Sequence, residues 1–300
     1  MSTLEKKQEG LIEGPFLFIV NPNSGTGTVK RFDDIIKNKQ RDQAIEVIIS
    51  QSPQHSIDLA RSAASRGYSS VVAVGGDGSV REIGIQLINS DCPLGIIPTG
   101  SGNGIARHLG ISMQMETAIE QVLNGKKRAI DTLLVNNKPA IGWCGTGIDG
   151  EVALAFDNAT ERGFSNYVKL SLDVLLTYKA TPMKVLWNDQ SKDFEAYTIV
   201  AANTTQYGNN AFINPKGKDD DGLLDLIVIK AMPTFAIMPL ASRLFLKSIT
   251  GSKWVEHIRS EKFTLINQGN APCQIDGEPV NMEETITFEI VPKSLTIIEP

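Results

Sequence analysis

The stretch VVAVGGDGSVREI, residues 71–83, decides the fold. Its first four residues are small or β-branched and apolar, which predicts a short buried strand. Three glycines around Asp77 follow, and then a helix begins. Glycine lets backbone approach a ligand closely, and amides at a helix N-terminus favour an anionic group such as phosphate. The Asp77 carboxylate suits a metal ion or a hydroxyl. Alone, the stretch is equally compatible with a tight strand-to-helix turn capped by aspartate.

The sequence around this stretch repeats the same strand-to-helix pattern. Strands are predicted at 15–20, 44–50, 71–74 and 94–97, and helices at 29–39, 56–66, 79–88 and 113–123. Alternating strands and helices predict a parallel sheet with right-handed crossovers. Ligands of such sheets bind at the carboxyl ends of the strands. Glycine-rich segments begin at three of these ends, at 21–27, 75–78 and 98–104. We therefore expect the three segments to converge on one ligand.

The pattern changes at about residue 126. Short strand-like runs separated by Gly, Asn and Asp turns occur at 130–136, 141–147, 183–187, 194–203, 223–230, 262–267, 273–276 and 285–291. Two helical patterns, 166–177 and 234–249, interrupt them. Many short strands predict a β-sandwich-like domain. The expected fold class is α/β plus β. We expect domains at 1–128 and 129–292, with a last strand at 294–298 and residues 293–300 returning to the first domain.

Composition excludes several classes of protein. The chain has 29 Lys and Arg against 34 Asp and Glu, which argues against a general nucleic-acid binder. Its three cysteines are widely spaced and form no CxxC pair, so a disulfide framework or zinc site is not expected. No apolar signal core opens the sequence, and no run of about eighteen apolar residues occurs. We expect a cytoplasmic protein that is able to touch the inner membrane face.

The familiar phosphate-binding motifs are missing. The sequence contains no Walker motif GxxxxGK[ST], and the glycine-rich segments at 25–27 and 100–102 both lack the third glycine that the dinucleotide fingerprint GxGxxG requires. It also lacks the HRD and DFG signatures of protein kinases. A dehydrogenase, a P-loop NTPase and a protein kinase are therefore disfavoured.

Five segments, in order, carry a resemblance to a known family. They are NPNSG at 21–25, GGDGS at 75–79, PTGSGN at 98–103, DGLLD at 221–225 and DGEP at 276–279. Together they resemble the diacylglycerol kinase catalytic-domain superfamily, which includes bacterial soluble lipid kinases and the sphingosine and ceramide kinases. The GGDG element alone is shared with NAD kinases and phosphofructokinases. The resemblance implies a Rossmann-like nucleotide-binding domain and a β-sandwich domain. It also implies phosphorylation of a lipid hydroxyl, dependent on ATP and Mg²⁺, in the cleft between them.

The resemblance also implies roles for individual residues. Glu278 matches the general base, and Asp77 lies in the phosphate loop, where it would orient the hydroxyl or reach a metal through water. Asp221 matches a metal-site aspartate, with backbone carbonyls of Lys218 and Leu223. Phosphoryl transfer needs such a carboxylate base, and Mg²⁺ prefers hard oxygen ligands. The implied nucleotide contacts are Asn21, Ser24, Gly25, Ser50, Gly75, Gly76, Asp77, Gly78, Ser79, Val80, Arg81, Gly100, Ser101 and Asn103.

Several of these residues have simpler interpretations. Segments 219–222 and 276–279 are each, taken alone, more typical of a turn, because DG is a strong hairpin signal. Asp149 is equally compatible with a place near the cleft and with a helix N-cap. His55, His108 and His257 have no metal-ligand spacing, so we expect surface or capping roles.

Two departures from the family leave the lipid and the details of nucleotide binding open. Gly104 follows Asn103 where many bacterial members have Asp, and the GSGN form is similar to sphingosine-kinase-like members. Arg81 stands at a position that is often Asn.

Alternatives to a diacylglycerol kinase are a sphingoid-base or ceramide kinase, an NAD-kinase-like enzyme and a non-catalytic lipid-binding regulator. The apolar stretch 235–246 fits a helix packed on the sandwich better than a lipid entrance or bilayer contact. The expected partners are a lipid substrate and a membrane surface, with a homodimer left open and no nucleic acid.

Overall fold

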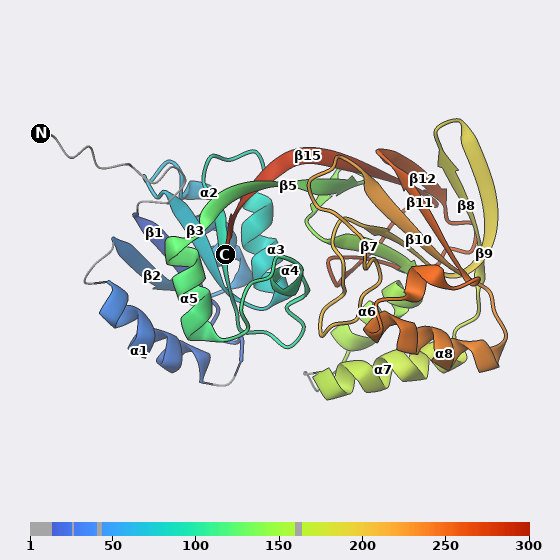
Figure 1. The fold of residues 1–300 in the computed structure, drawn as a ribbon, viewed down its shortest axis with the longest axis horizontal. Coiled ribbons are helices and arrows are strands. Elements are labelled where there is room, and N and C mark those ends of the chain that lie inside the picture. The colour runs from blue at the N-terminus through green and yellow to red at the C-terminus, as the bar shows by residue number, and fades with distance from the viewer. Residues whose placement is uncertain (1–13, 26, 41–43, 160–163) are drawn as a thin grey trace, which may run out of the picture.

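The computed structural model describes residues 14–25, 27–40, 44–159 and 164–300, which form two lobes joined by long strands (Figure 1). The first lobe alternates strands and helices as predicted. Its elements are β1 Phe16–Val20, α1 Thr28–Lys39, β2 Ile45–Ile49, α2 Pro53–Ser62, β3 Ser70–Gly75, α3 Asp77–Gln86, β4 Leu94–Pro98, α4 Gly104–His108 and α5 Met115–Asn124.

The strands of the first lobe lie in the order β2, β1, β3, β4 and are all parallel. Every residue of β1, β3 and β4 is buried, as expected for a sheet covered by helices on both faces. Since the strands are parallel, their carboxyl ends share one edge. The three glycine-rich segments therefore start side by side.

The second lobe is built mainly of antiparallel strands. Its elements are β5 Lys126–Val135, β6 Lys138–Ala140, β7 Trp143–Gly147, α6 Ile148–Asp157, α7 Phe164–Thr177, β8 Thr181–Trp187, β9 Gln190–Ala202, β10 Leu224–Lys230, α8 Thr234–Phe245, a 3₁₀ turn Ile249–Gly251, β11 Val255–Ser260, β12 Lys262–Ile266, β13 Cys273–Ile275, β14 Glu278–Val280 and β15 Thr285–Glu299. The side chains facing inward form a separate apolar core that includes Phe263 and Phe288. The predicted fold class, α/β plus a β-sandwich-like domain, is confirmed.

Strands β5 and β15 join the lobes. They pair along most of their length and arch from one lobe to the other (Figure 1). At its start β15 pairs with β12, and near its end Ile297 pairs in parallel with Leu94 of β4. The prediction of two separate strands, 285–291 and 294–298, is wrong. They are one strand with a register shift between Val291 and Leu295.

Three further details differ from the sequence prediction. The helix predicted over 234–249 ends at Phe245. Helix α6 and strand β11 were missed. The first contains a glycine and is short, and the second alternates charged residues with few apolar ones, so neither has a strong periodic signal. None of the described helices is long and apolar enough to cross a bilayer.

Candidate active site

The three glycine-rich loops are tied to one another at the edge of the sheet. The hydroxyl groups of Ser24 and Thr99 lie 2.8 Å apart, within hydrogen-bond distance. Asn21 Nδ2 donates to Ser79 Oγ at 2.8 Å. The amide of Thr99 donates to the carbonyl of Gly75. The loops that the sequence predicts to converge therefore form one connected surface.

Two glycines let the loops touch. A Cβ placed on Gly100 would lie 2.5 Å from the Cα of Gly76, closer than real side chains approach. The backbones of these two loops are therefore in direct contact, which a side chain at position 100 would prevent.

Asn103 holds the third loop in shape. It has a left-handed backbone with φ of 50°, and its side chain accepts from Gly100 N at 3.0 Å and donates to Gly100 O at 2.8 Å. Its neighbour Gly104 faces the second lobe, where a Cβ would lie 2.7 Å from the carbonyl oxygen of Tyr207. The glycine at 104 is thus explained by packing between the lobes.

The carboxyl group of Asp77 lies at the N-terminus of α3 and faces the start of α4. The amide of Ile105 donates to its Oδ1 at 3.4 Å. Burial raises the pKa of Asp77, and hydrogen bonds from the backbone at 103–105 offset part of that effect. A Cβ on Gly102 would lie 2.9 Å from Asp77 Oδ2. The loop at 98–104 therefore encloses this carboxylate.

Glu278 reaches the same place from the second lobe. Asp276 and Gly277 both have positive φ, 49° and 88°, and form a two-residue hairpin turn between β13 and β14. Glu278 is the first residue of β14 and is exposed. Its Oε1 lies 3.9 Å from the position of a Cβ on Gly78. Burial, and next the Glu278 charge, raise the pKa of nearby Glu82.

Asp276 fixes the hairpin rather than facing solvent. Its buried carboxylate accepts from the amides of Ile141, Gly142 and Trp143 at 2.8–3.0 Å. Burial raises its pKa, although these hydrogen bonds partly offset the effect. Arg81 Nε lies 4.0 Å from Asp276 Oδ2 and has no hydrogen-bond partner among the described residues.

Two cavities meet at these loops. One, of about 450 Å³, runs from Asp77, Gly78 and Glu278 into the second lobe between apolar side chains of α6, α7 and α8. The other, of about 380 Å³, is lined by Gly25, Thr99, Arg31 and Arg107 among others. Ser101 lines both cavities. The larger cavity is therefore suited to an apolar molecule and the smaller to a polar one.

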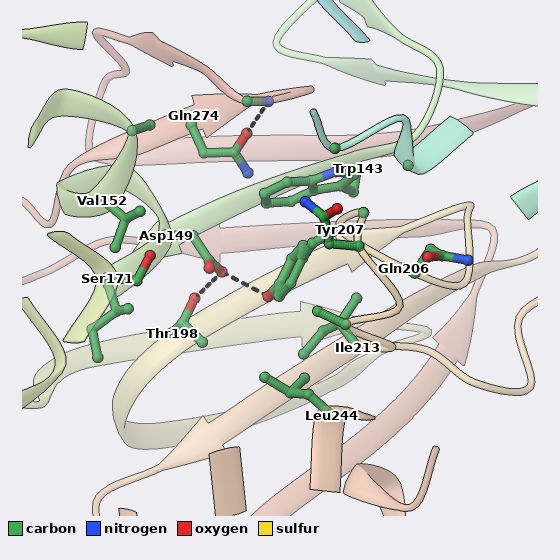
Figure 2. Close-up of a pocket in the computed structure, with 18 of the residues that line it drawn as sticks. Trp143, Asp149, Val152, Ser171, Thr198, Gln206, Tyr207, Ile213, Leu244 and Gln274 are labelled. Carbon is green, nitrogen blue, oxygen red and sulfur yellow. Dashed lines mark hydrogen bonds between the residues drawn. The ribbon is translucent and has the colours of Figure 1, made fainter. Parts of the chain in front are cut away.

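Asp149 is the polar group deep in the larger cavity (Figure 2). Thr198 Oγ1 donates to its Oδ2 at 2.6 Å, and the Tyr207 hydroxyl donates to the same atom at 3.1 Å. Burial raises the pKa of Asp149 to about 6, against the opposing effect of these two hydrogen bonds. Gln274 lines the same cavity, and its Nε2 is buried with no partner among the described residues.

The N-cap interpretation of Asp149 is wrong. Helix α6 begins at Ile148 with Gly147 as its N-cap, and no side chain caps it. The sequence signal was weak because a single Asp after a glycine-rich strand end is common to both interpretations.

The side chains of some residues predicted to contact the nucleotide are instead hydrogen-bonded or packed within the first lobe. The buried Ser50 hydroxyl donates to the carbonyl of Val20 at 3.2 Å, beside the first loop. The side chain of Val80 is in the core of the first lobe. Ser79 is buried and its hydroxyl accepts from Asn21, while the amide of Val80 donates to the carbonyl of Gly76.

In the predicted metal site, the carboxylate of Asp221 is already hydrogen-bonded at both oxygens by the protein. Asp221 Oδ2 accepts from Arg259 Nη2 at 2.6 Å, and its Oδ1 accepts from the amide of Leu223 at 3.2 Å. Lys218 and Leu223 lie in the same turn. Across the described part of the chain, no three His, Cys, Asp or Glu side chains are placed to hold a metal ion together.

Of the three histidines, His108 is not at the surface as expected, whereas His257 is exposed as expected. The side chain of His108 is buried and bonds Thr205 and Asp219. His257 bonds the buried Asp225 at 2.5 Å. His55 lies at the start of α2, where its Nδ1 accepts from the amide of Gln51. The sequence did not reveal these pairs because the partners lie 111 and 32 residues away.

Comparison with known proteins matches both lobes. Residues 15–135 match the model of the diacylglycerol kinase catalytic domain, and residues 142–299 match the YegS C-terminal NAD kinase beta sandwich-like domain. A diacylglycerol kinase of Mycobacterium tuberculosis is 25% identical over 96% of both chains. A probable lipid kinase YegS-like protein of Chromohalobacter salexigens is 24% identical over 81% of this chain and 80% of its own. The crystal structure of a putative diacylglycerol kinase from Bacillus anthracis superposes with a TM-score of 0.82 at 20% identity, covering 100% of this chain and 99% of that one.

Proposed function

We propose that this chain, which belongs to the diacylglycerol kinase catalytic-domain family, transfers the γ-phosphoryl group of ATP to the hydroxyl of a lipid such as diacylglycerol. One observation carries the proposal. The exposed carboxylate of Glu278 lies beside the GGDG loop at the mouth of an apolar cavity, and Ser101 separates that cavity from a polar one.

The polar cavity is the proposed nucleotide site. The glycines of these loops, which touch at Gly76 and Gly100, would let a polyphosphate approach the backbone, as in other glycine-rich phosphate sites. Arg31 and Arg107 line the cavity and supply positive charge, although Arg31 also pairs with Glu116. Mg²⁺ entering with the nucleotide would offset phosphate charge near Asp77, which is the carboxylate of the phosphate loop.

Glu278 is the proposed general base. It takes the proton of the lipid hydroxyl as that oxygen attacks the γ-phosphorus. A new oxygen–phosphorus bond forms, and the bond to the departing ADP breaks. The Asp276–Gly277 turn holds Glu278 in place, and Asp276 is itself held by three backbone amides. Asp77, on the other side of the same opening, orients the hydroxyl or the nucleotide-bound metal.

The apolar cavity is the proposed lipid site. Its walls include Val152 of α6, Leu172 and Leu175 of α7, and Leu240 and Leu244 of α8. Helices α7 and α8 both contribute to the wall of this cavity, and Figure 1 shows them on the same side of the second lobe. Phe235, Met238, Phe245 and Leu246 of this region are exposed, and Phe245 also lines the cavity. We propose that these side chains contact a bilayer so that the lipid enters from it, while the protein otherwise lies in the cytoplasm.

Helix α8 is compatible with both interpretations of the stretch 235–246. The inner face of α8, at Ala236, Ile237 and Leu240, packs on the sandwich as expected. The outer face is apolar and exposed, and Arg243 is the one ionisable residue in the α8 sequence. An apolar surface without acidic side chains is compatible with the head groups of an anionic membrane.

Asp149 favours a second candidate substrate, a sphingoid base. Diacylglycerol has no cationic group to place beside a carboxylate deep in an apolar cavity. The ammonium of an amino alcohol would meet the ionised Asp149, and its second polar group would satisfy Gln274 Nε2. The same kinase chemistry at Glu278 would then act on the terminal hydroxyl.

Purified protein incubated with labelled ATP, Mg²⁺ and a panel of lipids tests the proposal. The panel contains diacylglycerol, phosphatidylglycerol, ceramide and a sphingoid base, and NAD is included as a soluble acceptor. A labelled lipid phosphate from the wild type and none from Glu278→Gln supports a lipid kinase. Label in NADP alone would establish the NAD-kinase alternative. Lipid bound without label in any acceptor would indicate a non-catalytic lipid binder.

A further inference from the structure

The turn at residues 218–225, where the family resemblance implies a magnesium site, already has its negative charge balanced by the protein. We infer that the guanidinium of Arg259 occupies the role of the cation there, so that this chain binds no resident divalent metal at the turn. The Mg²⁺ that would accompany the nucleotide is a different ion, bound at a different place.

Arg259 bridges two carboxylates of the turn. Its Nη2 donates to Asp221 Oδ2 at 2.6 Å, and its Nε donates to Asp225 Oδ1 at 2.9 Å. The pairing of β10 with β11 fixes this arrangement, because Asp225 and Arg259 are direct cross-strand neighbours. An arginine guanidinium stays protonated in proteins, so this bridge carries a positive charge.

Asp225 has no oxygen left for a metal. Its Oδ1 is shared by Arg259 and His257, and Asn214 Nδ2 donates to its Oδ2 at 2.9 Å. The side chain is buried. Burial alone would raise the pKa of Asp225, but the hydrogen bonds from His257 and Asn214 outweigh burial and lower it.

Asp219 is held in the same way by the first lobe and the connecting strand. Arg128 of β5 donates to both of its oxygens, at 2.7 and 3.0 Å, and His108 of α4 lies 3.1 Å from Oδ2. Burial alone would raise the pKa of Asp219, but hydrogen bonds from His108 and Arg128 hold it well below its usual range. This carboxylate is also engaged at both oxygens.

The remaining buried carboxylate near the turn, that of Asp131, is hydrogen-bonded by two backbone amides. Asp131 accepts from the amides of Gly222 and Lys293, both at 2.7 Å. Mg²⁺ is usually bound through one or two carboxylates with several waters, and the carboxylate predicted for it here, that of Asp221, is paired with Arg259. Here a divalent ion would have to displace Arg259 and would sit beside its positive charge. The carboxylates of the turn therefore favour pairing with Arg259 over binding a metal ion.

Metal content and thermal unfolding of the full chain, without nucleotide, test the inference. We expect wild-type protein dialysed against a chelator to hold far less than one Mg²⁺ or Ca²⁺ per chain by mass spectrometry. Its Tm should be unchanged by chelator or by millimolar MgCl₂. Arg259→Ala should lower Tm by roughly 1–4 °C, since the ion pair is partly exposed. Millimolar MgCl₂ should recover part of that loss, because the carboxylate of Asp221 is then free.

Two variants are matched controls. Arg259→Lys keeps a positive charge at the turn and should not respond to MgCl₂. Arg61→Ala removes an exposed arginine that bonds Gln86 in the first lobe and should be equally insensitive.

A wild type that retains about one divalent ion per chain, or whose Tm falls with chelator, overturns the inference, and this arm needs no variant to fold. If MgCl₂ does not raise the Tm of Arg259→Ala, the claim that the guanidinium occupies the position of a metal ion is overturned. Neither result depends on lipid phosphorylation, so failure here is distinguishable from failure of the proposed function.

Discussion

Glu278 and Gly78 face each other across the two lobes, with Glu278 Oε1 at 3.9 Å from the position of a Cβ on Gly78. They are separated by 200 residues of sequence, since 278 − 78 = 200. Gly78 belongs to the first turn of α3, and Glu278 to the first residue of β14. The phosphate loop and the carboxylate base of the proposed kinase therefore come from separately folded parts of the chain.

Replacing Glu278 with glutamine should remove the proton acceptor and little else. We expect kcat for the lipid substrate to fall by roughly 10²–10⁴-fold, the usual contribution of a general base. Tm should stay within about 1 °C of wild type because the side chain is exposed. Steady-state kinetics and thermal unfolding measure the two effects. A variant that keeps more than about a tenth of wild-type kcat would assign the proton transfer to another group.

Gly100→Ala should disrupt the contact between the second and third loops. The new Cβ would lie 2.5 Å from the Cα of Gly76, so one loop has to move. We expect a loss of about 1–3 kcal/mol in the free energy of unfolding and a rise in KM for ATP. Gly251→Ala is the control, since its Cβ would meet only an arginine side chain at 3.8 Å. Equal effects of the two substitutions would contradict the proposed close approach.

Asp149→Asn should stabilise the protein more at neutral pH than at acid pH. The pKa of Asp149 is raised from 3.8 to about 6, so ionising it opposes folding. That cost is absent below pH 4 and complete above about pH 6. At about 1.4 kcal/mol per pKa unit, it is at most roughly 3 kcal/mol, and less because the carboxylate lines an open cavity.

The measurement is the Tm difference between Asp149→Asn and wild type from pH 4 to pH 8. The difference should rise with pH through the range between the two pKa values. Asp91→Asn, at an exposed aspartate, is the control. A difference that stays constant or shrinks with rising pH would show that burial does not raise this pKa.

Replacing Phe235 and Leu246 together with serine should weaken membrane contact without unfolding the protein. Phe235 is 80% exposed and Leu246 is 71% exposed. Each apolar side chain removed from a bilayer interface costs about 1–2 kcal/mol, so co-sedimentation with anionic vesicles should fall by at least tenfold. Ile49→Ser removes an exposed apolar side chain of the first lobe and is the control. Unchanged vesicle binding by the double variant would place the membrane contact elsewhere.

Much of the first lobe was predictable from local patterns. Three of its four strands, such as the one over 71–74, are fully buried apolar runs followed by turn-forming residues, and those two signals were enough to place them. The convergence of the segments at 21–25, 75–78 and 98–103 followed from parallel strand direction alone. Short or charged elements, such as α6 and β11, lacked a periodic signal and were missed.

The partners of charged residues were not predictable. The sequence assigns Asp221 to a metal by resemblance, yet the register of β10 with β11 brings Arg259 to it from 38 residues away. His108 was expected at the surface and instead contacts Asp219 of the opposite lobe. The sequence is compatible with Asp149 either near the cleft or as a helix N-cap. The packing of α6 against β7 and β9 places it in the cavity.

The sequence by itself determined the α/β plus β architecture, the loop at 75–78 and the family, because these depend on local periodicity and on short motifs in fixed order. The tertiary structure alone decided which groups meet. Glu278 reaches Gly78 because β13 and β14 form a two-residue hairpin anchored by Asp276 to the amides of 141–143. Contacts between distant segments depend on strand register and side-chain packing, which the order of residues does not display.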